Sequence, residues 1–313
     1  MMLNKEKNFV SAVIYVHNAE KRIENFLDMV IGIMEENFEH SEIICVNDCS
    51  DDESVDVIKK VSDKAKTTSV SVVNMSFFHG LELAMDAGMD LAIGDFVFEF
   101  DNTILDFESE MIMKIYHHSL TGYDIVSASP NRKEKLSSRL FYIVFDRFAG
   151  NSYEMTTESF RILSRRVINR ISSMNKTIPY RKAIYAGSGL KTANIKYEVK
   201  TDIRGNVDSK EKRYRTSLAV DTLILFTEFG YRFSFWMTSA MMLISVFMLI
   251  YTAIVYVIGH PIEGWTTTVL FLSVAFLGLF GILTIIVKYL QIIVDMVFKR
   301  KHYNFESIEK LTK

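Results

Sequence analysis

The 313-residue sequence has little net charge, few cysteines and no long apolar stretch at its amino-terminal end. A formal net charge of −2 gives no indication of nucleic-acid binding. The two cysteines, Cys45 and Cys49, are too few for a disulfide framework and fit a reducing compartment. They could form a metal-binding pair, but two buried small hydrophobic residues are favoured. The first segment, MMLNKEKNFV, lacks the apolar core of a signal peptide, so none is predicted.

What the sequence has in excess is apolar residues, which make up 49% of the chain and gather in its last third. Residues 233–259 and 265–287 contain no charge, and each run exceeds the roughly 20 residues that a membrane span needs. The alternative, two buried core helices, requires a larger soluble shell than the rest of the chain can supply. Lys and Arg flank the pair of segments and are absent between them. We therefore expect a transmembrane hairpin whose two ends both lie in the cytoplasm.

Residues 9 to about 200 alternate between strand-like and helix-like segments. Apolar, β-branched runs begin near residues 9, 41, 68, 96 and 123, and segments with helical apolar spacing separate them. This alternation predicts an α/β domain with a mostly parallel, Rossmann-like sheet covered by helices on both faces. Ligands of such sheets bind at the carboxyl ends of the strands. We therefore expect Asn18, Asp48 and Asp101 around one crevice.

Two further segments, residues 135–150 and 213–232, place aromatic and aliphatic side chains beside Arg and Lys. This pattern is typical of amphipathic helices at a membrane surface, and it also fits helices packed on the sheet. The expected organisation is a cytosolic α/β domain (1–212), a juxtamembrane helix (213–232), a hairpin (233–288) and a cytosolic tail (289–313).

Five segments occur in an order that resembles a known family. They are AVIYVHNAE, EIICVNDCSDDES, GLELAMDAGMDLAIGD, SFRILSRRVI and KYLQIIVDMVFKRKHY. Together with the hairpin they resemble a family 2 glycosyltransferase of the polyprenyl-phosphate type, a group that includes dolichyl-phosphate mannose synthase and bactoprenol glucosyltransferases. The resemblance implies a GT-A domain and a multi-pass protein of the inner membrane. It also implies assembly as a homo-oligomer, such as a tetramer.

The resemblance also implies the reaction. Such an enzyme moves a sugar, with inversion, from a nucleotide sugar such as a UDP-sugar to polyprenyl (undecaprenyl) phosphate, for cell-surface polysaccharide or lipid glycosylation. Because the acceptor phosphate oxygen is already anionic, the reaction needs positioning and charge neutralisation more than a strong base. A divalent cation, Mg²⁺ or Mn²⁺, commonly neutralises the leaving diphosphate, and arginines suit the acceptor phosphate.

By the same resemblance, a set of polar residues lies around the substrates. The residues implied at the base and ribose are His17, Asn18, Glu20 and Asp48. Those implied at the ribose and diphosphate are Asp101, also as metal ligand, and Asn102. Those implied at the acceptor phosphate are Arg132, Arg161 and Arg166.

Each of these assignments has a structural alternative. Asp48 could cap the following helix, and His17 could be a surface turn residue. Arg161, on a predicted strand, could pair with a structural carboxylate. Arg166 fits a solvated helix position better than a ligand.

The sequence departs from the family pattern at the metal motif. The family has Asp-x-Asp where this chain has Asp101-Asn102-Thr103, so a hydroxyl replaces the second carboxylate. Hard cations prefer carboxylates, so the metal is held more weakly unless Asp106 swings in. An active transferase is the favoured reading. A catalytically impaired member that acts as a binding or partner subunit, and a transferase with a glycan or diacylglycerol acceptor, stay open.

Overall fold

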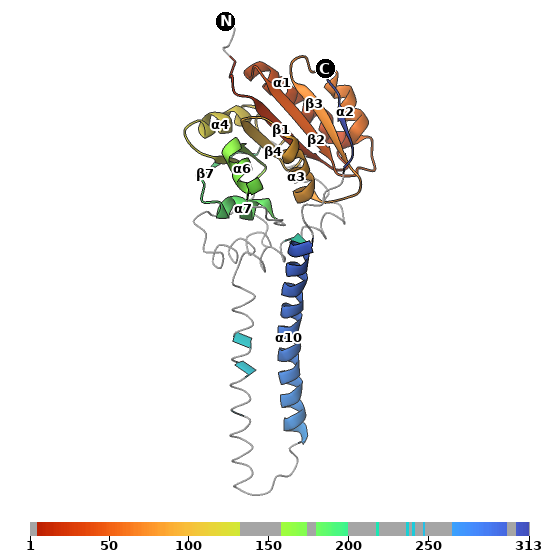
Figure 1. Cartoon of the computed structure of the whole chain (residues 1–313), viewed down its shortest axis with the longest axis vertical. Helices are drawn as coiled ribbons and strands as arrows, with labels where there is room; N and C mark the ends of the chain where they lie inside the picture. The colour runs from red at the N-terminus through yellow and green to blue at the C-terminus, as the bar shows by residue number, and fades with distance from the viewer. Residues whose placement is uncertain are drawn as a thin grey trace.

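The protein is described by a computed structural model that covers residues 5–131, 158–173, 180–199, 265–298 and 305–312, with a few positions between 217 and 247. Its centre is an eight-stranded sheet in the order β7-β5-β6-β4-β1-β2-β3-β8 (Figure 1). The strands are β1 (Val10–Val16), β2 (Ser41–Asn47), β3 (Ser69–Met75), β4 (Phe96–Phe100), β5 (Ile125–Pro130), β6 (Phe160–Ser164), β7 (Thr192–Tyr197) and β8 (Phe305–Lys310).

The central strands run parallel, as the alternating sequence predicts. β1 pairs in parallel with both β2 and β4, and β2 pairs in parallel with β3. β6 and β8 run antiparallel to their neighbours. The carboxyl ends of β1, β2, β3 and β4 therefore lie at one edge of the sheet, where the loops that follow them meet.

Helices cover both faces of the sheet because strand side chains are buried on both sides. One face packs against α1 (Glu20–Asn37), α2 (Ser54–Ser62) and α4 (Glu110–Ser119). The other face packs against α3 (Leu81–Leu91), α6 (Arg165–Ser173) and α7 (Arg181–Gly187). α3 approaches the sheet closely, since a Cβ added at Gly88 would lie 2.4 Å from Cγ1 of Val13. This close approach fixes the first turn of α3 beside the strand ends.

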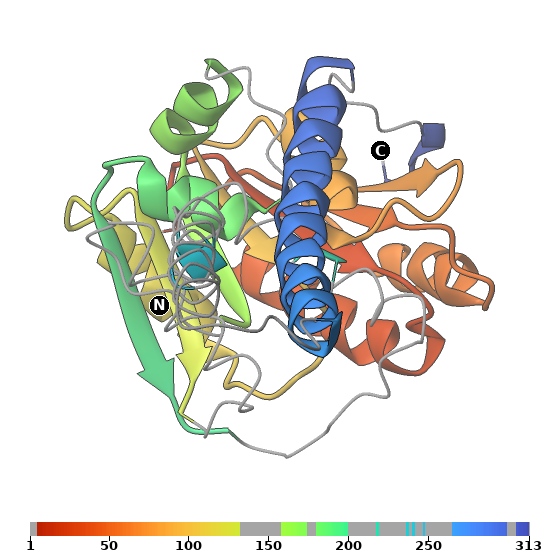
Figure 2. The ribbon, with the colours of Figure 1, turned by 90° about the horizontal axis from the view of Figure 1, so that it is seen from below.

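The long helix α10 (Trp265–Phe298) extends away from the sheet domain, with its carboxyl-terminal end nearest to the domain (Figure 1). Seen from below, it lies under the sheet domain (Figure 2). The second uncharged segment, 265–287, falls within α10. A search of the described residues, which omit many side chains of α10, finds no helix long and apolar enough to span a membrane. Residues 135–150 and nearly all of 213–259 lie outside the described part.

The last residues form a strand, although the sequence led us to expect only a tail after the hairpin. β8 pairs antiparallel with β3 and closes that edge of the sheet. The backbone amide of Leu311 donates to the carbonyl of Val70 at 2.8 Å, and Lys59 Nζ lies 2.7 Å from Glu309 Oε2. The chain after α10 is thereby tied to the edge of the sheet domain.

Candidate active site

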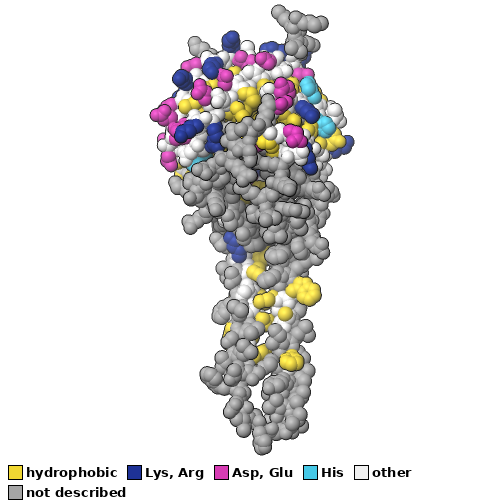
Figure 3. All heavy atoms as spheres, turned by 180° about the vertical axis from the view of Figure 1, so that it is seen from behind, with side chains coloured by type: hydrophobic (Ala, Val, Ile, Leu, Met, Phe, Trp, Pro, Cys, Tyr) yellow, Lys and Arg dark blue, Asp and Glu magenta, His cyan; other side chains and the backbone are white. Residues whose placement is uncertain are grey.

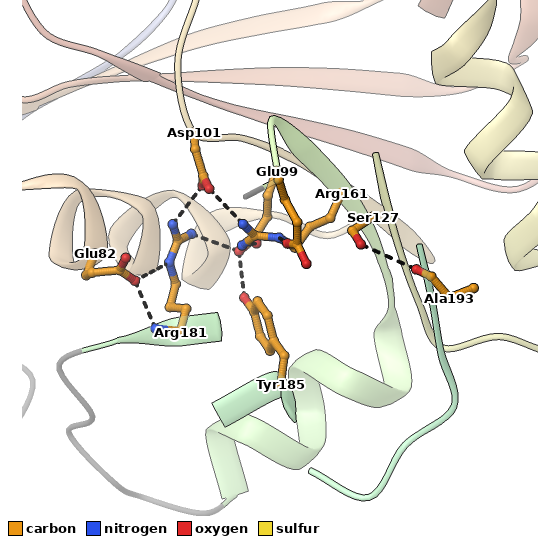
Figure 4. Close-up of polar contacts among 9 residues, drawn as sticks. Glu82, Glu99, Asp101, Ser127, Arg161, Arg181, Tyr185 and Ala193 are labelled. Atoms are coloured by element: carbon orange, nitrogen blue, oxygen red, sulfur yellow. Dashed lines mark hydrogen bonds and ion pairs between the residues drawn. The ribbon is translucent and has the colours of Figure 1, made fainter. Parts of the chain in front are cut away.

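A cluster of buried charges lies where β4 ends. Its members, called here the arginine cluster, are Glu82, Glu99, Asp101, Arg161, Arg181 and Tyr185 (Figure 4), together with Glu158, which pairs with Arg161. Arg161 comes from β6, directly opposite Glu99 of β4, while Arg181 and Tyr185 come from α7. β4, β6, α3 and α7 thus bring together residues that are far apart in the sequence.

The two guanidinium groups hold the same two carboxylates. Arg161 donates to Glu99 and to Asp101, each at 2.7 Å, and to Glu158 at 3.0 Å. Arg181 donates to Glu99 at 2.9 Å, to Asp101 at 3.0 Å and to Glu82 at 2.9 Å. Both oxygens of Asp101 therefore accept from an arginine, one from each (Figure 4). The arrangement satisfies charges that would be costly to bury alone.

Burial and charge together set the protonation of the cluster. Burial raises the pKa of Asp101, but the positive charges of Arg161 and Arg181 outweigh that effect and lower the pKa to about 2. Burial also raises the pKa of Tyr185, and the charge of Glu99 raises it further. Its hydroxyl donates to Glu99 at 2.8 Å. At neutral pH Asp101 is thus an ionised carboxylate between two guanidinium ions, and Tyr185 keeps its proton.

These residues do not fit a divalent cation at Asp101. Both of its oxygens are in ion pairs with arginines, and Thr103, two positions on, is neutral and buried. Asp106 is also buried, and its Oδ1 accepts from the hydroxyl of Tyr197 at 2.8 Å. Among the described residues, no three His, Cys, Asp or Glu side chains group as metal ligands. A cation approaching Asp101 would meet two positive charges that already hold the same oxygens.

A second polar centre lies at the ends of β1, β2 and β3 and is called here the aromatic corner: His17, Asp48, Phe77, Phe78 and His79. Asp48 is fully buried. Its carboxylate accepts from the backbone amides of His79 and Gly80, both at 2.8 Å, and from the hydroxyl of Tyr15 at 3.0 Å. Burial raises the pKa of Asp48, and these hydrogen bonds oppose the rise.

The first turn of α3 joins the two centres. Gly80, immediately before the helix, donates its amide to Asp48, and Glu82, two residues on, accepts from Arg181. The expectation that Asp48 and Asp101 lie at one edge of the sheet agrees with this arrangement.

The other residues singled out in the sequence mostly hold the loops. Asn18, whose φ is 46°, accepts from the amide of Asp51, and the amide of Glu20 donates to Asp52. Asn102 accepts from the amide of Ile104 in a local turn. Arg132 lies outside the described residues.

For two residues, Arg161 and Arg166, the structural alternative is what the structure contains. Arg161 is fully buried among carboxylates and has no exposed group to offer a phosphate. Arg166 is largely exposed and paired with Asp124. Asp48 does not cap the helix that follows its own loop: its carboxylate accepts from the amides of His79 and Gly80, in the loop before α3. Of the cysteines, Cys45 is buried as expected, whereas Cys49 is partly exposed.

Comparison with known proteins places the chain in a family. The sequence profile described as glycosyl transferase family 2 matches residues 11–172, just over half of the chain. The chain belongs to glycosyl transferase family 2.

Several relatives within family 2 match the chain. An uncharacterized glycosyltransferase of Synechocystis is 27% identical over 203 residues, 63% of each chain. The match covers about three fifths of the length of that relative and of one from Bacillus subtilis. The bactoprenol glucosyl transferase of Shigella phage SfX is 26% identical over 281 residues, covering 86% of this chain and 88% of that protein. The resemblance inferred from the five segments is thereby confirmed.

Solved structures show that the GT-A fold is shared. A glucosyl-3-phosphoglycerate synthase of Mycobacterium tuberculosis, in complex with Mn²⁺, UDP-glucose and phosphoglyceric acid, has a TM-score of 0.51 at 14% identity and covers 69% of this chain and 79% of its own. Mannosyl-3-phosphoglycerate synthase of Rubrobacter xylanophilus has a TM-score of 0.50 at 15% identity, covering 69% and 73%.

Most of the arginine cluster of this family 2 protein was not predicted from the sequence. Glu82, Glu99, Glu158, Arg181 and Tyr185 were not singled out. One signal was present, because Glu99 is a charge inside the apolar strand FVFEF, and a buried carboxylate needs a cationic partner. Nothing local to Arg181 identifies it as that partner, since it lies 82 positions away.

Proposed function

We propose that this chain is a membrane-bound, inverting glycosyltransferase that moves a sugar from a nucleotide sugar, a UDP-sugar, to polyprenyl phosphate. The observation that carries the proposal is the extent of the likeness to bactoprenol glucosyl transferases. It runs over 281 residues, too many to lie within the sheet domain alone. A likeness of that length extends into the uncharged segments, 233–259 and 265–287, which could hold a polyprenyl chain at the membrane.

The proposed reaction is a single displacement. An anionic oxygen of the acceptor phosphate attacks the anomeric carbon of the sugar and forms the new carbon–oxygen bond. The bond from that carbon to the donor diphosphate breaks, and its electron pair leaves with the nucleoside diphosphate. No proton has to be removed from the acceptor, so the reaction needs positioning and charge neutralisation rather than a base.

The arginine cluster would hold Asp101 rigid at the carboxyl end of β4, where ligands of α/β sheets bind. Asp101 would accept hydrogen bonds from the donor in place of a metal ion. The Mg²⁺ or Mn²⁺ expected from the family finds no fitting ligand set there, so no step is assigned to it.

We further propose that α10 is the second helix of a membrane hairpin and that the sheet domain lies on the cytosolic side. Among the side chains of α10 that the structure describes, seven large apolar ones are exposed, at alternating spacings of four and three residues: Leu272, Phe276, Leu279, Leu283, Ile286, Leu290 and Ile293. The sheet domain instead mixes acidic and basic side chains on its surface (Figure 3). An apolar stripe of this kind suits lipid or a neighbouring membrane helix, including that of a second copy in a homo-oligomer.

A catalytically impaired partner subunit is the second candidate. It is favoured by one observation, that Asp101 is already occupied by two arginines while Thr103 replaces the second carboxylate.

The test is transfer by the purified full chain in detergent, with polyprenyl phosphate and a panel of labelled UDP- and GDP-sugars, with and without Mn²⁺. Lipid-linked label is expected from at least one donor. Asp101→Asn should abolish it, whereas Asp56→Asn, on the exposed face of α2, should not. No turnover with any donor, combined with no nucleotide binding by calorimetry, supports the partner subunit instead.

A further inference from the structure

A row of polar side chains crosses three neighbouring strands near the edge of the sheet that β8 closes. Ser307 of β8, Asn74 of β3 and Asn47 of β2 lie at paired positions of their strands. Nδ2 of Asn74 donates to Oγ of Ser307 at 3.0 Å, and Nδ2 of Asn47 donates to Oδ1 of Asn74 at 3.0 Å. Nδ2 of Asn74 also lies 3.5 Å from Oε1 of Glu309, at the limit of a hydrogen bond. This row is called here the asparagine ladder.

The asparagine ladder continues into the loops at the carboxyl ends of β1 and β2. Oδ1 of Asn47 accepts from the backbone amide of Ser50 at 3.2 Å, and Oγ of Ser50 accepts from the backbone amide of Asn18 at 3.1 Å. Oδ1 of Asn18 then accepts from the backbone amide of Asp51 at 2.9 Å. An unbroken run of hydrogen bonds therefore joins β8 to these two loops.

Both loops contain unfavourable backbone at the points that the ladder reaches. Asn18, with φ 46°, and Cys49, with φ 53°, are the two non-glycine residues of positive φ in the described part of the chain. Left-handed backbone is unfavourable for a residue with a Cβ and persists where the surrounding contacts hold it. The bond from the Ser50 amide to Asn47 closes the turn that contains Cys49, and the bond to Ser50 holds Asn18. The ladder thus stabilises the conformation of both loops.

The two asparagines point the same way along the ladder. Each donates through Nδ2 toward β8 and accepts through Oδ1 from the side of the loops. Turning one amide over would place Nδ2 of one asparagine against Nδ2 of the other, so each amide fixes the orientation of its neighbour. The state of one end of the ladder therefore affects the other end.

The β8 end of the ladder belongs to the part of the chain that follows α10. Residues 299–304 separate α10 from β8, and the carboxyl-terminal end of α10 is the one nearest to the sheet domain (Figure 1). A displacement of α10 that draws β8 away from β3 would withdraw Ser307 from Asn74. The loops after β1 and β2 would then lose the support that holds their left-handed residues.

We propose that Asn74 and Asn47 are positioning residues that make these two loops depend on the docking of β8, so that the position of α10 controls how tightly the donor is held. This inference rests on the proposed function, since it takes a nucleotide sugar at this edge of the sheet as the ligand. The coupling is reciprocal: a nucleotide that binds better when the loops are ordered must also stabilise the docking of β8.

The test combines hydrogen exchange and calorimetry with UDP on the full chain in detergent. Ser307→Ala should speed the exchange of the Ser50 and Asp51 amides and weaken UDP binding roughly 2- to 10-fold, the range for losing one hydrogen bond. Ser307→Thr keeps a hydroxyl and should restore both. Glu306→Ala, at the exposed preceding position of β8, is the matched control and should change neither. In the wild type, UDP should slow the exchange of the amides of residues 305–311.

A double-mutant cycle separates the ladder from a general effect on the sheet. Asn47→Ala interrupts the ladder, so Ser307→Ala added to it should weaken UDP binding no further. Asn74→Ala serves the same purpose if Asn47→Ala does not fold. A loss for Ser307→Ala that adds in full to either variant would overturn the inference, because β8 would then act without the ladder.

Two further outcomes distinguish this inference from the proposed function. Sugar transfer by the wild type, with loop exchange and UDP affinity both unchanged in Ser307→Ala, refutes the inference and leaves the proposed function standing. Loop exchange that responds to Ser307→Ala, in a protein that binds no nucleotide and transfers no sugar, supports the coupling through the ladder and contradicts the proposed function.

Discussion

The arginine cluster and the aromatic corner both surround an aspartate at the end of a parallel strand, yet they hold it by different means. Asp101 is held by two guanidinium ions that also bind three other carboxylates. Asp48 is held by two backbone amides and one hydroxyl, all neutral. The pKa of Asp101 is lowered to about 2, whereas that of Asp48 is raised.

This difference separates two kinds of preorganisation. In the arginine cluster four carboxylates share two guanidinium groups, so removing either arginine leaves several carboxylates with a lost partner in a buried place. In the aromatic corner the carboxylate fixes a loop, on which Phe77 is exposed to solvent and His79 is buried. Loss of a charge in the arginine cluster should therefore lower the free energy of unfolding strongly. In the aromatic corner the sensitive change is loss of an acceptor oxygen of Asp48.

The largest expected effect comes from removing one guanidinium. Arg181→Met should lower the free energy of unfolding by about 3–5 kcal/mol, because Glu82, Glu99 and Asp101 each lose a buried partner. Thermal or denaturant unfolding of the full chain in detergent measures it. Arg166→Gln is the matched control, since Arg166 is 68% exposed and should cost less than about 1 kcal/mol. If both variants lost a similar amount of unfolding free energy, the burial of Arg181 would not make its ion pairs more important than the exposed pair of Arg166.

Acid should weaken the arginine cluster in a defined range. The pKa of Asp101 is depressed in the folded state, so its stabilisation is complete above its unfolded value of 3.8 and is lost as pH falls toward about 2. The difference in unfolding free energy between the wild type and Asp101→Asn should therefore shrink by about 2 kcal/mol between pH 4 and pH 2. Unfolding at a series of pH values tests this. A constant difference across the range would mean that the arginines do not favour the charged form.

Asp48→Asn should have a smaller effect. The amide keeps one acceptor oxygen but replaces the other by a donor, so the amide of His79 or Gly80 loses its partner. We expect a loss of about 1–2 kcal/mol in unfolding free energy, together with weaker UDP binding as the loop between β3 and α3 loosens. Asp63→Asn, on the exposed end of α2, is the control. A variant that keeps wild-type UDP affinity would show that Asp48 does not position the loop.

The positions of both aspartates could be predicted from the sequence, whereas the residues that contact them could not. The strands and helices through β5 were predictable because each is a local run with a clear period and a turn after it, as in the run that forms β4. The order of the parallel strands then brings Asn18, Asp48 and Asp101 to one edge without any further information. Their side-chain partners were not predictable in the same way.

The missed features depend on contacts between distant segments. β8 consists of FESIEK, whose alternating charges look like a solvated tail until its backbone pairs with β3. A motif identified Arg161, but whether it binds a phosphate or structural carboxylates depends on the side chains around it. Glu99 and Arg181 face it, and only the antiparallel pairing of β4 with β6 and the placement of α7 bring them there.

The smallest expected effect concerns divalent cations. Because two arginines hold both oxygens of Asp101, removing Mn²⁺ with a chelator should change UDP affinity by less than about threefold. Calorimetry with and without the chelator measures it. Thr103→Asp restores a second carboxylate two residues from Asp101, and hard cations prefer such a pair. This variant should bind UDP more tightly with Mn²⁺ than without it.

The matched control is Asn102→Asp, which adds the same charge one residue earlier, where the side chain holds the local turn to Ile104. It should gain little dependence on Mn²⁺. If the wild type already loses most of its UDP affinity in the chelator, the substrate diphosphate must recruit the cation in spite of the arginines. The ion pairs of Asp101 would then have to open when the donor binds, and the arginine cluster would be less rigid than its contacts imply.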